Sequence, residues 1–398
     1  MVSQYYGLRA MKIRELLAEA APVGREYQHL EDLLIINGAK GGLEALEELR
    51  HAAAEPSSMD LKWDGGAAVF WGRDDAGQFV FAPKNQWSKK QQLDKDGLSY
   101  EIKSTGRAKP GQSAEEFAQV RAGMASKYEK LWDLFEAATP KNFRGYLNGD
   151  LMFTAPQTLN KQTNEYEFTP NKVTYHVAAN GLGGKMAGAQ AFVVVHGKID
   201  EFGADATGGI YSVSASVVDK FNQTPGLIVL NTQTPQVKLP TNGKEIDQAV
   251  KFVRSNAGAI DEIANYTAPK FTTLKRILYD YAVARAKTAG GKDFAQWLES
   301  SKVSEPQRII IRELMRKPSW PIFWAAFHQI LDAKHVILDQ LHSTGGVEMQ
   351  NRLGIRSTVG GKQGGEGLVK KMKSGGMGKL VNPEFRSAPV NPQFAPDV

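Results

Sequence analysis

The sequence contains no cysteine among its 398 residues. This absence excludes disulfide scaffolds, thiolate zinc sites, iron–sulfur clusters and cysteine nucleophiles. Any metal ion must therefore be held by oxygen or imidazole ligands. The sequence also lacks an apolar run of the roughly 18 residues that a membrane-spanning helix needs. Residues 1–20 alternate charged and apolar side chains instead of forming the apolar core of a signal peptide. We expect a cytoplasmic protein that does not contact a membrane.

Two further absences concern repeats and nucleotide-binding loops. The sequence has no internal repeat, and no G-x-x-x-x-G-K-[ST] segment, which argues against a P-loop enzyme. Lysine and arginine number 49 against 43 aspartate and glutamate residues, giving a net charge of +6. So small an excess is compatible with a nucleic-acid partner without requiring one. The position of the basic residues is therefore more informative than their number.

Changes in hydrophobic pattern divide the chain into five segments. They are an N-terminal helical preface (1–55), the first part of a β-rich core (56–240), an all-helical insertion (241–345), a closing part of the core (346–386) and a disordered tail (387–398). Either Met1 or Met11 is the natural start of the chain, because the helical pattern begins only at Met11. In the insertion, Trp320 and Trp324 are interpreted as core residues instead of a base-stacking platform.

The β-rich core is predicted from short apolar runs that are separated by turn residues. These runs are LKWDGGAAVFWG, GQFVFAP, GYLNGDLMF, KVTYHVA, AQAFVVVHG, GIYSVSASV and GLIVL. Because strands follow one another without regular helices between them, the pattern favours an α+β fold with antiparallel sheets over a doubly wound fold. One helix interrupts the strands at residues 114–138, with Val120, Met124 and Leu131 among the apolar residues along one face.

Lys62 lies in the run LKWDGGAAVF, where strand-forming residues flank an Asp-Gly turn. A lysine held at the mouth of a strand pair is positioned, and it acts as a nucleophile when burial or cationic neighbours keep its amine neutral. The alternative interpretation is a hairpin turn with an exposed lysine. Residues elsewhere in the chain are needed to decide between the two.

A basic stretch with aromatic residues follows this turn. Its basic residues are Lys84, Lys89, Lys90, Lys95, Lys103, Arg107 and Lys109, and they are interleaved with Trp87 and Tyr100. Such a mixture is typical of surfaces that follow a phosphate backbone and stack on bases. A solvated basic loop is an equally good interpretation of the same pattern.

Several short motifs accompany Lys62 in a fixed order. The motif residues are Lys62, Asp64 and Gly65 in LKWDGG, Lys84 in APKNQW, Asn148, Gly149 and Asp150 in GYLNGDLMF, Phe192 in AQAFVVVHG, Glu366 and Lys371 in EGLVKK, and Lys379 in GKLVNPEF. In this order they resemble the K-x-D-G, D-G-E, aromatic, E-G-x-V-x-K and terminal lysine motifs of the superfamily of ATP-dependent DNA ligases, RNA ligases and mRNA-capping enzymes. Lys370 is a less favoured stand-in for Lys371. Phage-encoded ligase-like members with a helical preface are similar to this chain, which would place it in the host cytoplasm.

The resemblance implies an antiparallel-sheet nucleotidyltransferase (adenylation) domain with a helical insertion and preface. It implies ATP and Mg²⁺ or Mn²⁺ as cofactors, and a monomer that acts on RNA or DNA ends. Lys62 would attack the α-phosphorus of ATP and carry AMP, which passes to a 5′-phosphate that a 3′-hydroxyl then attacks. Catalysis of such a transfer is mainly positioning and charge stabilisation.

The resemblance also assigns a role to each motif residue. Asp64 and Gly65 would shape the turn of Lys62. The metal or ribose contacts would be Asp150 and Glu366, since carboxylates are the ligands that magnesium prefers. The remaining roles are base stacking for Phe192, and phosphate contact for Lys84, Lys371 and Lys379.

The sequence departs from the family pattern at two points. Asn148 takes the place of the first acid of D-G-E, and too few residues follow Lys379 for the oligonucleotide-binding barrel that follows this core in DNA ligases. The missing barrel slightly favours RNA over DNA as the substrate. Two alternatives stay open, namely nucleotide transfer to another acceptor, and a non-catalytic nucleic-acid-binding or virion-associated protein that retains the ligase fold.

Overall fold

The computed structural model describes most of the chain. The described residues are 28–55, 59–108, 111–171, 173–204, 213–231, 243–267, 277, 280–281, 293–344, 355–359, 362–363, 367–373 and 377–381. They form two compact units. The sheet unit comprises Met59–Val237, Leu341–Leu368 and Ala388–Val398, and the helical unit comprises Met1–Ser58, Lys238–Gln340 and Val369–Ser387. The predicted tail and the two candidate start residues lie outside the described part of the chain.

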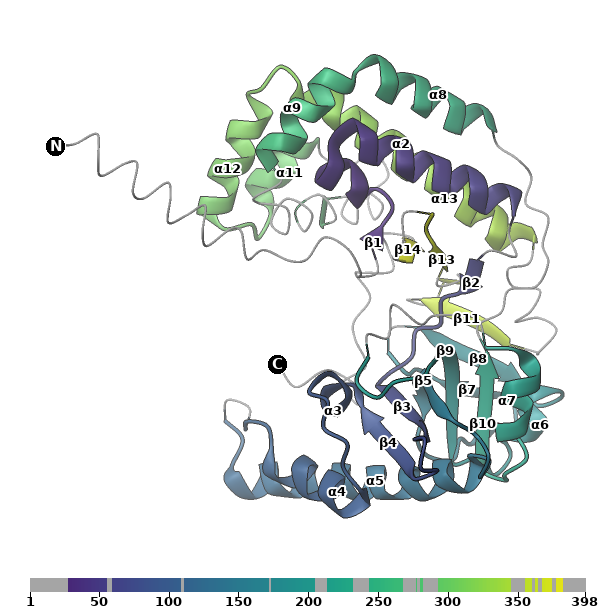
Figure 1. Cartoon of the computed structure of the whole chain (residues 1–398). Coiled ribbons are helices and arrows are strands. Elements are labelled where there is room, and N and C mark those ends of the chain that lie inside the picture. Colours follow the sequence, from purple (N-terminus) through teal and green to yellow (C-terminus); the bar gives the residue numbers. More distant parts are fainter. Residues whose placement is uncertain are drawn as a thin grey trace. The chain divides into compact units, whose positions relative to one another are not determined.

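A five-stranded sheet forms the centre of the sheet unit (Figure 1). Its strands, in spatial order, are β10 (Leu227–Asn231), β9 (Ala191–Ile199), β5 (Gly145–Phe153), β3 (Ala68–Arg73) and β4 (Phe79–Pro83). All neighbours are antiparallel except β9 and β10, which are parallel because the connection between them contains a crossover helix, α7 (Ala215–Phe221). The α+β class that the sequence predicts is confirmed, with this one parallel pair as a correction.

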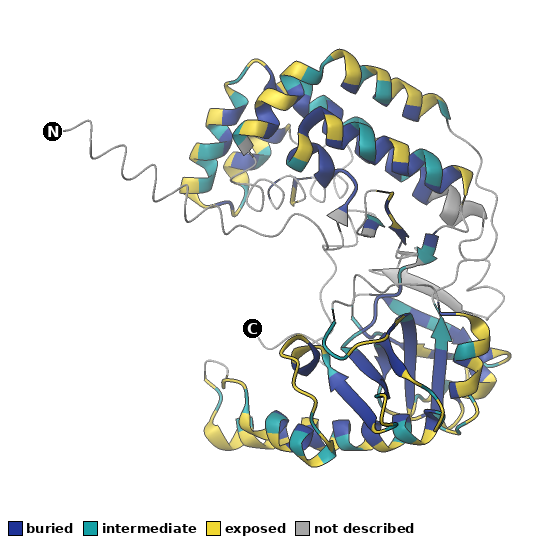
Figure 2. Cartoon of the chain, in the orientation of Figure 1, coloured by how far each residue is buried: buried dark blue, intermediate teal, exposed yellow. Residues whose placement is uncertain are grey.

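Helices cover one face of this sheet. They are α4 (Lys95–Ser104), α5 (Ala114–Ala138) and α7. The strands alternate, so that Trp71 and its partners on this face are buried against Phe135 of α5, at 4.9 Å between ring centroids, and Phe221 of α7. Figure 2 shows the strands as buried and the outer side of α5 as exposed. The strand residues of this face are mainly apolar, and Arg73 at the end of β3 donates to the carbonyl oxygens of Thr139 and Pro140.

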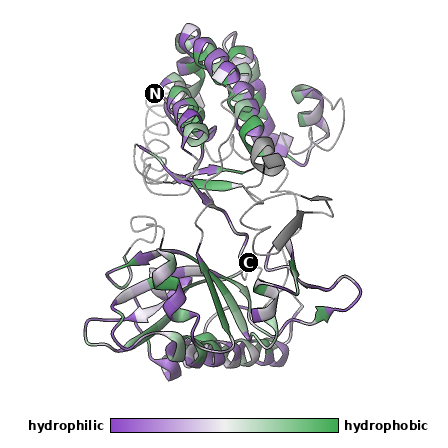
Figure 3. Ribbon diagram, turned by 90° about the vertical axis from the view of Figure 1, so that its right-hand side faces the viewer, coloured by the Kyte–Doolittle hydropathy of each residue, from purple (hydrophilic) through white to green (hydrophobic). Residues whose placement is uncertain are grey.

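A second, smaller sheet belongs to the same unit. Its strands, in spatial order, are β12 (Lys362–Gln363), β11 (Ile355–Val359), β8 (Thr174–Ala178), β7 (Glu165–Phe168) and β6 (Leu159–Asn160). All neighbouring strands in it are antiparallel. Figure 3 shows apolar strands and polar connections in this unit, the pattern that a packed sheet core produces.

Aromatic rings join the two sheets. Phe153 and Phe192 of the central sheet pack edge-on against Phe168 of the second sheet, at 5.3 and 5.9 Å between centroids. Trp63, just before β3, stacks on Tyr175 of β8 at 5.4 Å. Aromatic pairs of this kind stabilise the fold by about 0.5–1.5 kcal/mol each beyond the area that they bury. They fix the segment that contains Lys62 against both sheets.

The helical unit is built around α2 (Asp32–Ala54). The other helices with described bounds are α8 (Gly243–Ser255), α9 (Ala257–Thr267), α11 (Phe294–Ser300), α12 (Glu305–Met315) and α13 (Trp320–Thr344). Helix α2 packs against α8 and α9 because residues such as Leu46 and Leu49 form an apolar stripe that is wholly buried. The described residues of the predicted preface, 28–55, and those of the insertion up to Gln340 thus belong to one compact unit. Trp320 is buried, as the core interpretation predicts.

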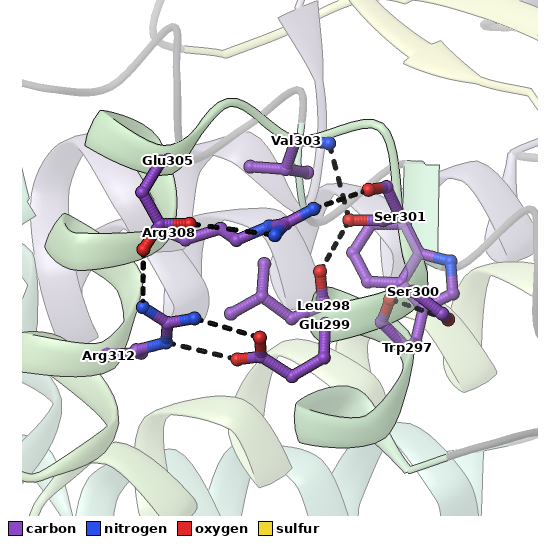
Figure 4. A network of polar contacts seen from close by, with 9 residues as sticks. All are labelled: Trp297, Leu298, Glu299, Ser300, Ser301, Val303, Glu305, Arg308 and Arg312. Carbon is purple, nitrogen blue, oxygen red and sulfur yellow. Dashed lines mark hydrogen bonds and ion pairs between the residues drawn. The ribbon is translucent and has the colours of Figure 1, made fainter.

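Ion pairs attach α12 to α11 (Figure 4). The Arg312 guanidinium donates to both carboxylate oxygens of Glu299, at 3.0 and 2.8 Å, and to Glu305 at 2.7 Å. Arg308 donates to the carbonyl oxygen of Ser301 at 2.7 Å. These contacts neutralise the basic residues of α12, so this surface is structural.

Three short strands complete the helical unit. Strand β1 (Gln28–His29) pairs in parallel with β14 (Met377–Leu380), and β13 (Leu368–Lys371) lies next to β14. The closing motifs of the sequence therefore lie on neighbouring strands of this unit. Among the helices that the structure describes, none has the length and apolar character required to cross a membrane.

Candidate functional site

The K-x-D-G turn is held in place by its aspartate. The Asp64 carboxylate is buried, and its two oxygens accept hydrogen bonds from the Asn171 side chain at 2.9 Å and from the backbone N–H of Val173 at 3.0 Å. The backbone N–H of Asp64 donates to the Tyr175 hydroxyl at 2.9 Å. Both carboxylate oxygens are used for anchoring. Asp64 therefore fixes the conformation of the turn that carries Lys62.

The glycine of the turn lies directly against the third motif. A Cβ atom added at Gly65 would overlap with the Cβ atom of Asp150 on β5. The next residue, Gly66, donates its backbone N–H to the carbonyl oxygen of Leu151 at 2.8 Å. Only glycine permits so close an approach. Two motifs that are far apart in the sequence are therefore adjacent in the fold.

Lys62 connects the turn to a third motif segment. Its backbone N–H donates to the carbonyl oxygen of Gly367, at 3.1 Å, and Gly367 is the glycine of the E-G-x-V-x-K match. Its side chain is partly exposed and near enough to act electrostatically on Asp150. An isolated hairpin turn with an exposed lysine would require neither the hydrogen bond to Gly367 nor the proximity to Asp150.

Asp150 is the centre of a charged cluster with Lys62, Lys84 and His196. Its Oδ2 lies 3.1 Å from His196 Nε2, and the two side chains are 26% and 19% exposed. Burial raises the pKa of the Asp150 carboxyl, but the charge and hydrogen bond of His196 and the charges of the two lysines outweigh it, so that the pKa is lower than usual. Asp150 is accordingly a carboxylate at neutral pH.

Sequence reasoning missed His196. It follows three valines in β9, where Phe192, Val194 and His196 recur at the two-residue spacing of one strand face. Val194 is the register partner of Asp150, which places His196 beside the carboxylate. A polar residue at the end of an apolar strand, on the face of the preceding motif residue, is the signal that identifies it.

Asn148 occupies the first acid position of the third motif. It is buried on β5, opposite Phe70 of β3, and lies on the same strand face as Asp150. Asp150 is therefore the only one of the two motif positions that supplies a carboxylate.

The structure does not place Phe192 for base stacking. Its ring is 0% exposed and packs edge-on against Trp63, Phe153 and Phe168. The reason is that β9 is an inner strand whose two faces are both covered. The prediction from the resemblance is therefore corrected, and Phe192 is a core residue.

The basic stretch is corrected in part. Lys84 is exposed at the start of α3 (Lys84–Ser88), but Trp87 of the same helix is buried, stacks on Phe70 at 4.3 Å and donates its indole N–H to the Ala204 carbonyl oxygen. Three of the lysines form ion pairs, namely Lys89 with Glu101, Lys95 with Asp133 and Lys103 with Glu129. Lys109 lies outside the described residues. Tyr100 is 72% exposed and is available for stacking.

The two closing lysines lie on strands of the helical unit. Lys371 is exposed at the end of β13, and Lys379 is partly exposed on β14. Lys370, the stand-in for Lys371, is buried. The remaining motif residue, Glu366, lies outside the described residues. In the part of the chain that the structure describes, no three His, Asp or Glu side chains gather as a metal-binding group.

Comparison with protein families assigns the chain by sequence. The model of a family of unknown function, DUF6267, matches residues 26–280, more than half of the chain. The chain belongs to the DUF6267 family. The region that matches DUF6267 contains Lys62, Asp150 and His196, and it ends before Lys371. Comparison with curated proteins gave no match, and comparison with solved structures gave none either.

Proposed function

We propose that this DUF6267 chain is an ATP-dependent nucleotidyltransferase similar to polynucleotide ligases, with Lys62 as the nucleophile. It would form a lysine–AMP intermediate and join 5′-phosphate and 3′-hydroxyl ends, with RNA slightly favoured over DNA. The observation that carries the proposal is the contact between Gly65 and Asp150. A chance K-x-D-G match in a hairpin has no reason to lie against the matching third motif.

The fold is compatible with this proposal at the level of its layers. Two sheets joined by aromatic residues, with helices on the outer face of one of them, would serve as a nucleotidyltransferase core. The turn with Lys62 lies where the two sheets meet, because Asp64 hydrogen-bonds to residues of the second sheet and its preceding loop. In this proposal Phe192 does not contact the adenine base of ATP, because its ring is buried.

Lys62 would act through its side-chain amine. The lone pair of Nζ attacks the α-phosphorus, the N–P bond forms, the bond to the pyrophosphate oxygen breaks, and a proton leaves the amine. The charge of Lys84, near Asp150, would stabilise the phosphates during this step. Lys371 and Lys379 are assigned to the α-phosphate by the motif match alone.

Asp150 fits the role of a magnesium ligand. Its lowered pKa keeps it ionised, and an ionised carboxylate is the ligand type that Mg²⁺ or Mn²⁺ requires. Glu366 would be the second carboxylate. When bound, the metal would neutralise charge on the phosphates. His196 would orient the Asp150 carboxylate through the hydrogen bond at Oδ2.

Labelling with α-³²P-ATP and magnesium tests the proposal. We expect a covalent, acid-labile adduct with the wild-type chain and none with Lys62→Ala. Lys89→Ala is the matched control, because Lys89 is an exposed lysine of the same unit that pairs with Glu101. A wild-type protein that never becomes labelled would show that the chain is not an adenylating enzyme. If it is labelled, nicked duplex DNA and broken RNA as acceptors identify the substrate.

Asn148 favours a second candidate function. Without the first acid of the motif, the chain would be a non-catalytic nucleic-acid-binding or virion-associated protein that retains the ligase fold. This candidate predicts binding of RNA or DNA that weakens at raised salt, with no covalent adduct under any metal condition.

A further inference from the structure

A buried glutamate from α2 holds β13, the strand that carries Lys371. The Glu48 carboxylate forms an ion pair with Lys370 Nζ, and the two side chains are only 3% and 2% exposed. Its other oxygen accepts a hydrogen bond from the backbone N–H of Lys373 at 2.7 Å. Glu48 therefore binds β13 through a side chain and the residues after β13 through the backbone.

This anchoring distinguishes two adjacent lysines. Successive side chains of a strand point to opposite faces, so when Lys370 is directed inward to Glu48, Lys371 is directed outward. The structure shows this alternation, with Lys370 buried and Lys371 exposed. A buried carboxylate needs a cationic partner, so Lys370 cannot turn outward without leaving the charge of Glu48 uncompensated.

We infer that Glu48 is a positioning residue for the proposed adenylation. By holding Lys370 inward, it leaves Lys371 as the lysine that β13 exposes, and the motif match assigns this lysine to the α-phosphate of ATP. The inference rests on the proposed function and adds to it a residue from the N-terminal helix, outside every motif of the sequence. Without Glu48, Lys370 would no longer be held inward and would compete with Lys371 for the exposed face.

Single-turnover labelling of Lys62 by α-³²P-ATP measures this effect. At saturating ATP we expect Glu48→Gln to lower the rate constant of adduct formation about tenfold, with the labelled fraction and the half-saturating ATP concentration unchanged. Loss of stability alone would instead lower the labelled fraction and leave the rate constant as it was. Glu47→Gln is the matched control, because Glu47 is the neighbouring glutamate and is 52% exposed.

Two further variants separate positioning from other effects. In a Lys371→Ala background, Glu48→Gln should cause no further fall in rate, because Glu48 acts through Lys371. The double variant Glu48→Gln/Lys370→Met removes both buried charges, and we expect a rate constant within about threefold of the wild type. If Glu48→Gln does not fold, the double variant takes its place in the test. A rate constant of the double variant as low as that of Lys371→Ala would then overturn the inference.

The outcomes distinguish this inference from the function on which it rests. A wild-type protein that does not become labelled overturns both. A labelled wild type with an equally fast Glu48→Gln variant overturns the role of Glu48 alone. Independent, additive losses from Glu48→Gln and Lys371→Ala have the same consequence, because they would show that Glu48 does not act through Lys371.

Discussion

The imidazole of His196 lies 3.1 Å from the carboxylate of Asp150, on the sheet face that the helices leave uncovered. A β-bulge lies beside this pair, where the register of β5 and β9 shifts between Asn148 and Gly149. Bulges commonly redirect a side chain at a functional site. Here the bulge lies at His196, which is the residue between the register partners of Gly149 and Asn148.

Substitution of this histidine should weaken metal binding. In His196→Ala the Asp150 carboxylate loses the hydrogen bond that orients it, and loss of such a partner lowers metal affinity by about 10- to 100-fold. We expect Lys62 labelling to require correspondingly more magnesium. The measurement is a titration of adduct formation with Mg²⁺. An unchanged titration would mean that the histidine has a structural role only.

The lowered pKa of Asp150 predicts a pH-dependent contribution to stability. A carboxyl group whose pKa is lower in the folded state stabilises the fold above its unfolded pKa, and this contribution is lost as the pH falls through the folded pKa. Asp150→Asn should therefore reduce the free energy of unfolding at about pH 7 and have a much smaller effect at about pH 3. Urea unfolding of both proteins at the two pH values measures the difference. An effect that grows on acidification would contradict the assignment.

The contact between Gly65 and Asp150 predicts that a methyl group added at Gly65 slows the labelling of Lys62. In Gly65→Ala the new Cβ would meet the Cβ of Asp150, so the turn has to shift away from β5. Misplacement of a reacting group by about 1 Å costs about 100-fold in rate. We expect a loss of that size in the labelling rate, because the turn that moves also carries Lys62.

Gly123→Ala is the control for this change. Gly123 lies within α5, and a Cβ atom there would have no neighbour within 4 Å. Alanine in place of glycine in an exposed helix interior stabilises by about 1 kcal/mol. This variant should label at the wild-type rate and unfold at higher urea concentration. Equal labelling rates for Gly65→Ala and Gly123→Ala would show that the contact between Gly65 and Asp150 is unimportant.

Local elements of the fold could be predicted from the sequence. The run GYLNGDLMF corresponds to β5, Gly145–Phe153, and the helix predicted at residues 114–138 is α5. Both signals are local, since the strand has turn residues at its ends and α5 begins with a capping box formed by Ser113 and Glu116. The apolar face predicted for this helix is wrong at two positions, because Val120 and Met124 are 59% and 37% exposed.

The roles of the aromatic residues could not be predicted in this way. Phe192 and Trp87 have the composition of stacking residues, yet both are buried by segments distant in the sequence. The strand expected in GIYSVSASV is a further error over its described part, since α7 begins at Ala215. Val218 and Phe221 of this helix are buried in the core, and this packing outweighs the β-branched residues there.

The arrangement of the motif residues could be predicted in part. Their order in the sequence indicated that Lys62 and Asp150 belong to one site, and the structure places Gly65, Asp150 and Gly367 around the turn of Lys62. His196 and Glu48 belong to no motif, and their partners, Asp150 and Lys370, are contacts that exist only in the folded chain. The order of the motifs thus predicted that Gly65 and Asp150 are neighbours, whereas the contacts of His196 and Glu48 depend on the fold.

The buried pair of Lys334 and Glu31 predicts the largest loss of stability. Both side chains are 0% exposed, with 2.6 Å between Lys334 Nζ and Glu31 Oε1, and the pair attaches α13 to the start of α2. Lys334→Met leaves a buried carboxylate without this lysine, and breaking such a pair costs about 3–5 kcal/mol. The double variant Lys334→Met/Glu31→Gln should recover most of this loss, because no buried charge remains uncompensated. Urea unfolding measures both. A double variant as unstable as Lys334→Met would show that the loss arises from packing of the lysine stem instead of from charge.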